Sequence, residues 1–218
     1  MLQTLEIETA PGSQSSVIWL HGLGADGHDF EPIAHELDLG AIPVRFVFPH
    51  APMMPVTINQ GFVMRAWYDI ASSDLGRHED EAGVRASQSA VEALVARELG
   101  RGVPARRIVL AGFSQGGAIA LQTGLRHPER LAGIMALSAY VPIASTLADE
   151  AHAANRDAPI FMAHGDLDPI VPIQRARDSR TLLEELGYRV EWHEYRMPHA
   201  VCPEEIAHIG AWLKRVLE

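Results

Sequence analysis

The sequence predicts an α/β protein in which helices cover both faces of a mostly parallel central sheet. Short apolar runs alternate along the chain with longer helical patterns, and this alternation is typical of a parallel sheet. Most inner runs are continuously apolar, as expected for strands that are buried on both sides. We find no internal repeat, low-complexity segment or linker, so residues 1–218 are expected to form one domain.

The expected strands are Leu2–Thr9, Val17–Leu20, Val44–Phe48, Ile108–Ala111, Ile134–Leu137, Ile160–Ala163 and Arg189–Tyr195. The first alternates apolar and polar residues, which predicts an edge strand. The expected helices are Phe30–Leu37, Ala82–Leu99, Gln115–His127, Gln174–Leu186 and Glu204–Leu217. The second, third and fourth helices are followed directly by Gly100, Pro128 and Gly187, and glycine and proline commonly end helices.

The segment Pro49–Glu81 interrupts this alternation and is long for a loop, which favours a functional role. Within it, the part around Val56–Met64 is expected to form a hairpin that turns at residues 59–61. Its apolar side chains have two interpretations of about equal weight: they cover the core, or they form the wall of a substrate pocket. The candidate pocket residues are Met54, Ile58, Met64, Trp67, Ile70 and, farther along the chain, Val171.

The composition excludes several functional classes. The chain has 218 residues, 47% of them hydrophobic, one cysteine and a net charge of −10. A single cysteine cannot form an internal disulfide, and an acidic protein repels the phosphates of nucleic acids. The N-terminus lacks the basic and apolar pattern of a signal peptide, and no apolar run is long enough to span a membrane. We therefore expect a cytoplasmic protein that neither binds nucleic acid nor inserts into a membrane.

The segment Gly112–Gly116 reads Gly-Phe-Ser-Gln-Gly and lies between a predicted strand and a predicted helix. A G-x-S-x-G sequence in this context is typical of a nucleophile elbow, in which a tight turn exposes the serine at the carboxyl edge of the sheet. The N–H of Gln115 would lie at the start of the helix, where negative charge is stabilised. A glycine-rich packing turn is the alternative, and the flanking strand and helix make it the weaker interpretation.

A serine nucleophile needs a histidine base, which in this architecture follows the serine along the chain. Among the histidines after Ser114, His199 lies in a loop between the last predicted strand and the last helix, from which it can reach the carboxyl edge of the sheet. The acid that orients it is expected after a strand, and the loop after Ile160–Ala163 offers Asp166 and Asp168. Spacing favours Asp168 and leaves Asp166 open.

The run His21–Gly27 follows the strand Val17–Leu20 and is rich in glycine. Here the N–H of Leu23 is the candidate partner of the Gln115 N–H in an oxyanion hole. A dinucleotide-binding loop is the competing interpretation. The dinucleotide-binding interpretation is disfavoured because no acidic residue stands at the end of a second strand about 20 positions further on. The lysine of a phosphate-binding loop is also missing.

Together these segments resemble the α/β-hydrolase carboxylesterases related to acyl-protein thioesterases and lysophospholipases, especially the short bacterial carboxylesterases. The resemblance covers nearly the whole chain and is carried by Leu20–Gly24, Pro49–Pro52, Trp67–Ile70, Gly112–Gly117, Leu137–Ser138, His164–Asp168, Val171–Pro172 and Pro198–His199. It implies an α/β-hydrolase fold with Ser114 as nucleophile, Asp168 as acid and His199 as base, and with Leu23 and Gln115 as the oxyanion hole. Pro198 departs from the family, which often has glycine before the active histidine.

The expected function is therefore that of a serine carboxylesterase, which hydrolyses short- to medium-chain esters through an acyl-enzyme on Ser114. Ser138 and Pro159 enclose about twenty residues, too few for a large lid, so we expect an open site that binds a small-molecule ester. The alternative is an acyl-protein thioesterase or a lysophospholipase with the same triad, and the non-enzyme alternative is an inactive ligand-binding protein.

Further expectations concern cofactors and partners. The proposed chemistry needs no cofactor and no metal. The lone Cys202 is expected to be a small buried hydrophobic residue rather than a nucleophile, because serine occupies the elbow. The resemblance adds a homodimer near the site as an expectation.

Overall fold

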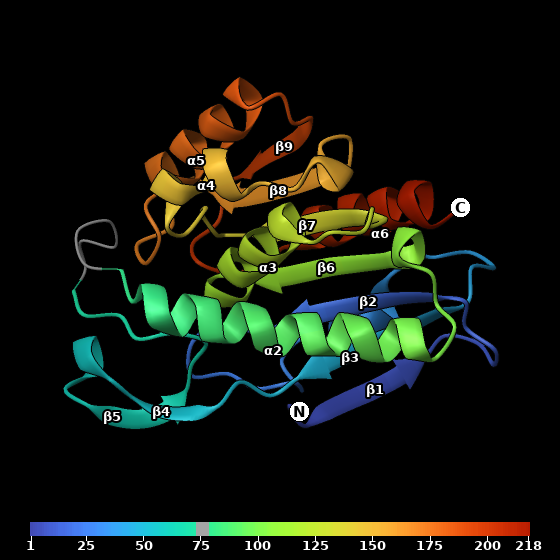
Figure 1. Ribbon diagram of the computed structural model, residues 1–218, viewed down its shortest axis with the longest axis horizontal. Coiled ribbons are helices and arrows are strands. Elements are labelled where there is room, and N and C mark those ends of the chain that lie inside the picture. Colours follow the sequence, from blue (N-terminus) through green and yellow to red (C-terminus); the bar gives the residue numbers. More distant parts are fainter. Residues whose placement is uncertain (73–78) are drawn as a thin grey trace.

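The computed structural model describes residues 1–72 and 79–218, and a seven-stranded sheet lies at its centre (Figure 1). Its strands are β1 (Thr4–Glu8), β2 (Ser15–Leu20), β3 (Val44–Pro49), β6 (Ile108–Phe113), β7 (Gly133–Leu137), β8 (Ile160–Gly165) and β9 (Val190–Tyr195). Their order across the sheet is β1-β3-β2-β6-β7-β8-β9, with β1 antiparallel and all other pairs parallel. The expectations of a mostly parallel sheet and of an N-terminal edge strand are confirmed.

Helices cover both faces of this sheet. On one face lie α2 (Glu81–Gly100), α3 (Gln115–Arg126) and α5 (Ile173–Glu185), and on the other lie α1 (Glu31–Glu36) and α6 (Pro203–Leu217). Shorter elements are α4 (Leu147–Glu150) and the 3₁₀ turns η1 (Thr57–Asn59), η2 (Ala105–Arg107), η3 (Ala144–Thr146) and η4 (Ala153–Asn155). The sequence predicted the five long helices to within one or two residues at their ends, but it predicted none of these short elements.

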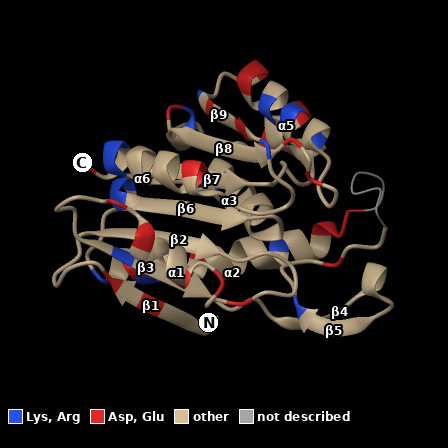
Figure 2. Ribbon diagram, turned by 180° about the vertical axis from the view of Figure 1, so that it is seen from behind, with Lys and Arg blue, Asp and Glu red and all other residues tan. Residues whose placement is uncertain are grey.

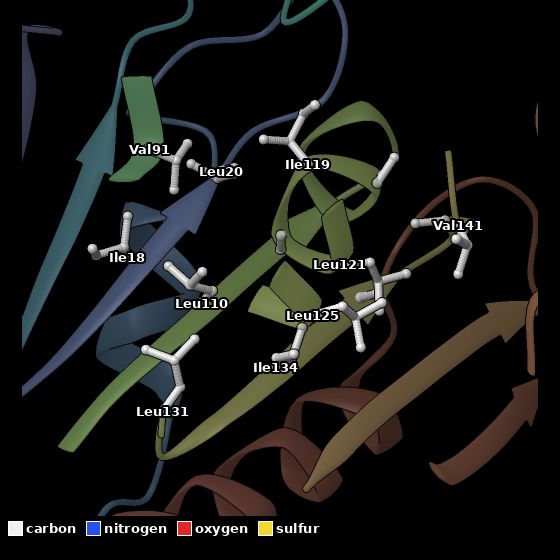
Figure 3. Packing of buried hydrophobic residues seen from close by; sticks show 14 of the residues in the cluster. Ile18, Leu20, Val91, Leu110, Ile119, Leu121, Leu125, Leu131, Ile134 and Val141 are labelled. Carbon is white, nitrogen blue, oxygen red and sulfur yellow. The ribbon is translucent and has the colours of Figure 1, made fainter. Parts of the chain in front are cut away.

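The core is divided by the sheet into two clusters. Along β2, Ile18 packs into the cluster under α2 and α3, whereas the next residue, Trp19, packs into the cluster under α1 and α6. Figure 3 shows the first cluster, with Leu125 of α3 beside Ile134 of β7 and with Val91 of α2 near Leu20 of β2. Strands β2, β6, β7 and β8 carry no Lys, Arg, Asp or Glu and are drawn without charge colours in Figure 2. This two-sided burial explains their continuous apolar sequences.

The long excursion between β3 and α2 contains the expected hairpin, formed by β4 (Met53–Val56) and β5 (Phe62–Arg65). Its connection ends in left-handed backbone at Gln60 and Gly61, with φ of 58° and 76°. Residues 73–78 of the predicted long segment lie outside the described residues.

No large cap covers the carboxyl edge between Ser138 and Pro159, because this stretch forms only α4, η3 and η4. The expectation of no large lid is confirmed. In the described part of the chain, no helix is both long enough and apolar enough to cross a membrane.

Candidate active site

Ser114 stands at the turn where β6 ends and α3 begins. Its backbone has φ 55° and ψ −122°, a strained conformation for a residue with a side chain, and its N–H donates to the Leu137 carbonyl at 2.8 Å. A Cβ added at Gly112 would lie 2.2 Å from the carbonyl carbon of Gly116, and one added at Gly116 would lie 2.3 Å from the Leu20 oxygen. The turn is therefore so tight that both flanking positions require glycine.

Asp168 and His199 meet at the same edge of the sheet, although they are 31 residues apart in the chain. Nδ1 of His199 lies 2.6 Å from Oδ2 of Asp168, whose side chain is fully buried. The other carboxylate oxygen accepts the N–H groups of Ile170 and Val171 at 2.8 and 2.9 Å. A carboxylate held in this way fixes the proton of the imidazole on Nδ1 and leaves Nε2 as the basic nitrogen.

The two loops that carry this pair are joined by their backbones. The N–H groups of Asp166 and Leu167 donate to the carbonyls of Tyr195 and Met197 at 2.9 and 3.2 Å. A Cβ added at Gly165 would lie only 2.2 Å from the Met197 oxygen, so the loop that bears the base packs directly on this glycine. Asp166, the alternative acid left open by spacing, contributes its backbone here, and Asp168 is the carboxylate that bonds to His199.

The ring of His199 lies beside the nucleophile elbow. Its centroid is 4.7 Å from that of Phe113, the residue before Ser114. Within the described residues, no direct hydrogen bond joins the Ser114 hydroxyl to His199. Hydrogen bonds between such groups are often long in a free enzyme and tighten when substrate binds.

His164 lies against Asp168, the candidate acid, and was not selected by sequence reasoning. Its Nε2 lies 2.8 Å from the Val171 carbonyl and 3.3 Å from Oδ2 of Asp168, and its ring is fully buried. Burial lowers the pKa of His164, so the neutral ring with its proton on Nε2 donates to the Val171 carbonyl. The sequence placed this histidine at a strand end but gave no sign of where its ring points.

Leu23 and Gln115, the candidate oxyanion donors, line one cavity together with Ser114. Nδ1 of His21 lies 2.7 Å from the Gly22 carbonyl, while Nε2 accepts the N–H of Ala51 at 3.0 Å. The Gly22 carbonyl and the Leu23 N–H belong to one trans peptide and point in opposite directions, so the hydrogen bond to His21 turns the Leu23 N–H away from that ring. Burial lowers the pKa of His21 to about 4, which keeps this ring neutral.

Trp67 links the loop after β2, at His21, to Gln115 of the elbow and to Ser87 of α2. Its backbone N–H donates to Oε1 of Gln115 at 3.1 Å, and its indole N–H donates to the His21 carbonyl at 2.9 Å. The Trp67 carbonyl accepts the hydroxyl of Ser87 from α2. The Gln115 side chain also donates to the Tyr68 carbonyl at 2.9 Å, so the excursion after β5 is fixed against the start of α3.

The cavity beside Ser114 has a volume of about 350 Å³ and mostly apolar walls. Its lining residues are Leu23, Ile58, Asn59, Tyr68, Ile70, Ser114, Gln115, Tyr140, Pro169, Ile170 and Val171. We refer to it as the acyl cavity. Three of the candidate pocket residues, Ile58, Ile70 and Val171, lie in its wall. Sequence reasoning missed Tyr68 and Tyr140, whose buried hydroxyls are 2.9 Å apart.

The expectation that Met54, Met64 and Trp67 line the pocket is wrong for this cavity. Met54 and Met64 are paired opposite each other across the β4–β5 hairpin, and neither is among the residues that line the cavity. The sulfur of Met64 contacts the side-chain amide of Asn59, which does line it, at 3.3 Å. Trp67 is 2% exposed and is occupied by the three contacts described above. Within residues 1–72 and 79–218, no cluster of three His, Cys, Asp or Glu side chains could hold a metal ion.

The chain is similar to known hydrolases over nearly its whole length. A family model described as phospholipase/carboxylesterase matches residues 5–217. Acyl-protein thioesterase 1 of Neurospora crassa is 42% identical over 213 residues, which cover 91% of this chain and 85% of that protein. The crystal structure of Zea mays acyl-protein thioesterase 2 matches with a TM-score of 0.85 and 27% identity and covers 100% of both chains. That of Arabidopsis thaliana SOBER1 matches with a TM-score of 0.87 and 31% identity and covers 94% of this chain and 99% of that one.

Proposed function

Because the chain belongs to the phospholipase/carboxylesterase family and has the α/β-hydrolase fold, we propose that it is a serine hydrolase that cleaves acyl thioesters and esters. The observation that carries this proposal is the 2.6 Å contact between His199 and buried Asp168 at the sheet edge that also carries the strained Ser114. A base oriented by a carboxylate, at the sheet edge that carries a serine in a strand-to-helix turn, is the arrangement that acyl transfer requires.

In the proposed cycle, Nε2 of His199 takes the Ser114 proton as Oγ attacks the substrate carbonyl carbon. The N–H groups of Leu23 and Gln115 stabilise the oxyanion that forms. His199 then returns the proton to the leaving sulfur or oxygen, and the acyl group remains on Ser114. Water attacks this acyl-enzyme by the same route and releases the acid.

The similar proteins named acyl-protein thioesterases support a thioesterase better than the small-ester carboxylesterase that the sequence favoured. We therefore put S-acylated proteins or peptides first as the substrate class, with the chain of the acyl group in the apolar acyl cavity. A carboxylesterase for short- to medium-chain esters is the second candidate. It is favoured by the absence of a large cap between Ser138 and Pro159, which leaves the site open to small esters.

The test compares kcat/KM for an S-acylated peptide, a lysophospholipid and a small aryl ester, with fluorophosphonate labelling of the wild type and of Ser114→Ala. The variant should lose both labelling and activity, with kcat reduced by roughly 10⁶. A preference for the thioester peptide supports the first candidate, and a preference for the aryl ester supports the second. Retention of most activity by Ser114→Ala would refute the mechanism.

A further inference from the structure

A second hollow lies next to His199 and shares no lining residue with the acyl cavity. It is a groove of about 300 Å³. Asp29, Phe30 and Ile33 form its wall on the side of α1, and His199 and Val201 form its wall on the side of the loop after β9. We call it the His199 groove. Nothing in the chemistry described so far uses it.

The groove starts at the nucleophile elbow. Phe113, which also lines it, directly precedes Ser114 in the chain. The ring centroid of Phe113 is 4.7 Å from that of His199 and 5.6 Å from that of Phe30. Two aromatic rings thus form part of the groove wall beside His199, at the residue that precedes Ser114.

The chemistry of acyl transfer indicates which part of the substrate would lie at the His199 groove and which at the acyl cavity. When the tetrahedral intermediate collapses, the bond from the carbonyl carbon to the leaving sulfur or oxygen breaks, and its electron pair stays on the leaving atom. That atom takes the proton from Nε2 of His199, while the acyl group stays bonded to Oγ of Ser114. The leaving atom must therefore lie at His199, and the carbonyl carbon of the acyl group must lie at Ser114, which lines the acyl cavity.

We propose that the His199 groove binds the leaving group and selects an apolar leaving group that carries a positive charge. This proposal rests on the proposed function, since it needs His199 to act as the proton donor. Asp29 is the one Asp or Glu in the groove lining, which contains no Lys or Arg. Its carboxylate has no ion pair or side-chain hydrogen bond within the part of the chain that the structure describes.

The surroundings of Asp29 favour a cation. Partial burial and the charge of Asp26 raise the pKa of Asp29, and a cation bound beside the carboxylate would stabilise its ionised form. No Lys or Arg occurs between residues 21 and 44, the segment that includes Asp29 and α1. The faces of aromatic rings such as Phe113 also attract cations, above all quaternary ammonium groups. The groove thus combines apolar walls with an unpaired negative charge.

The test uses two esters with the same acyl group: butyrylcholine and its uncharged isostere, 3,3-dimethylbutyl butyrate. For each, kcat/KM is measured with the wild type and with Asp29→Lys, which reverses the charge in the groove. Glu36→Lys is the matched control, because it makes the same change at an exposed position at the other end of α1, outside the groove. We expect Asp29→Lys to lower the ratio of choline ester to neutral ester about fivefold or more. Glu36→Lys should leave this ratio unchanged.

A second readout separates the groove from the acyl cavity. Asp29→Lys should leave the relative kcat/KM of butyrate and octanoate esters of one alcohol unchanged, whereas Ile58→Ala in the acyl cavity should change it. An unchanged choline ratio in Asp29→Lys, or an equal drop in Glu36→Lys, would overturn the proposal for the groove. This result is distinct from failure of the proposed function, which shows as activity that survives Ser114→Ala.

Discussion

His21 holds the peptide that carries the Leu23 N–H, one of the two proposed oxyanion donors. Its ring is 1% exposed, and both of its nitrogens are used, one on the Gly22 carbonyl and one on the Ala51 N–H. Only the first bond acts on the peptide that carries the Leu23 N–H. Substitutions that keep one nitrogen and lose the other therefore separate a positioning role from simple packing.

We expect His21→Asn to be much more active than His21→Gln. The Asn amide occupies the place of Nδ1 and can still donate to Gly22, whereas the Gln amide occupies the place of Nε2. Loss of a well-placed oxyanion donor costs about 10²–10³ in kcat, so Gln should approach this loss and Asn should lose about tenfold or less. KM should change little in both. Steady-state kinetics on one ester, with melting temperatures of both variants, provide the measurement, and equal losses in kcat would contradict the prediction.

At the scale of elements, the ends of β8 and β9 act as one unit, because Gly165 leaves room for the loop that carries His199. A backbone carbonyl at 2.2 Å from an added Cβ cannot move aside as a flexible side chain can. We expect Gly165→Ala to displace this loop and to lower kcat/KM by about 100-fold, the cost of a small misplacement of a catalytic group. The rate of fluorophosphonate labelling should fall in parallel.

The matched control for this prediction is Gly100→Ala. Gly100 ends α2, and an added Cβ there would meet no heavy atom within 4 Å. Alanine is the better helix former, so this variant should keep full activity and be equally or slightly more stable. Wild-type kcat/KM in Gly165→Ala would show that the contact between the two loops does not position the base.

On the scale of the whole molecule, buried Glu205 in the first turn of α6 makes stability depend on pH. Its side chain is 0% exposed, and burial, which outweighs the opposing effect of a backbone hydrogen bond from Cys202, raises its pKa to about 8 from an ordinary value of 4.5. The folded state therefore holds a proton that the unfolded state releases. This contribution to stability is complete below pH 4.5 and is lost as the pH rises through 8.

We expect Glu205→Gln, which cannot ionise, to raise the melting temperature at pH 9 by roughly 5–10 °C. At pH 4 the variant and the wild type should melt within roughly 3 °C of each other. Glu204→Gln removes the same charge at the neighbouring exposed position and should show no comparable gain at pH 9. Thermal unfolding followed by circular dichroism at both pH values checks this, and an equal shift at both would disprove the linkage.

A structural feature can be predicted from the sequence when the residues that determine it are neighbours in the chain, and is harder to predict when they are far apart. The strands and the elbow depend on neighbouring residues, so the apolar runs and the segment Gly112–Gly116 were sufficient. Ser114, Asp168 and His199 each come after a parallel strand. Parallel strands end at the same edge of the sheet, so the sequence could predict that these three residues lie near one another. Their catalytic roles stay predictions.

Features that depend on register or on distant partners could not be predicted. Met54 and Met64 are absent from the lining of the acyl cavity, and which face of the hairpin they occupy depends on how β4 pairs with β5, since a shift of one residue would exchange the two faces. Tyr68 and Tyr140 meet across 72 positions of the chain. No periodicity in the sequence reports such a contact, so the walls of the cavity were predicted less well than its reactive centre.

The backbone of Ser114 has a consequence for the evolution of this protein. Left-handed φ at a residue with a side chain is unfavourable, and glycine would adopt the same turn without that strain. Selection for thermal stability alone would thus favour the replacement that removes the proposed nucleophile. With Ser114 in the role that we propose, stability and catalysis are opposed at this position, and the serine persists only while selection for turnover outweighs the gain from a relaxed fold.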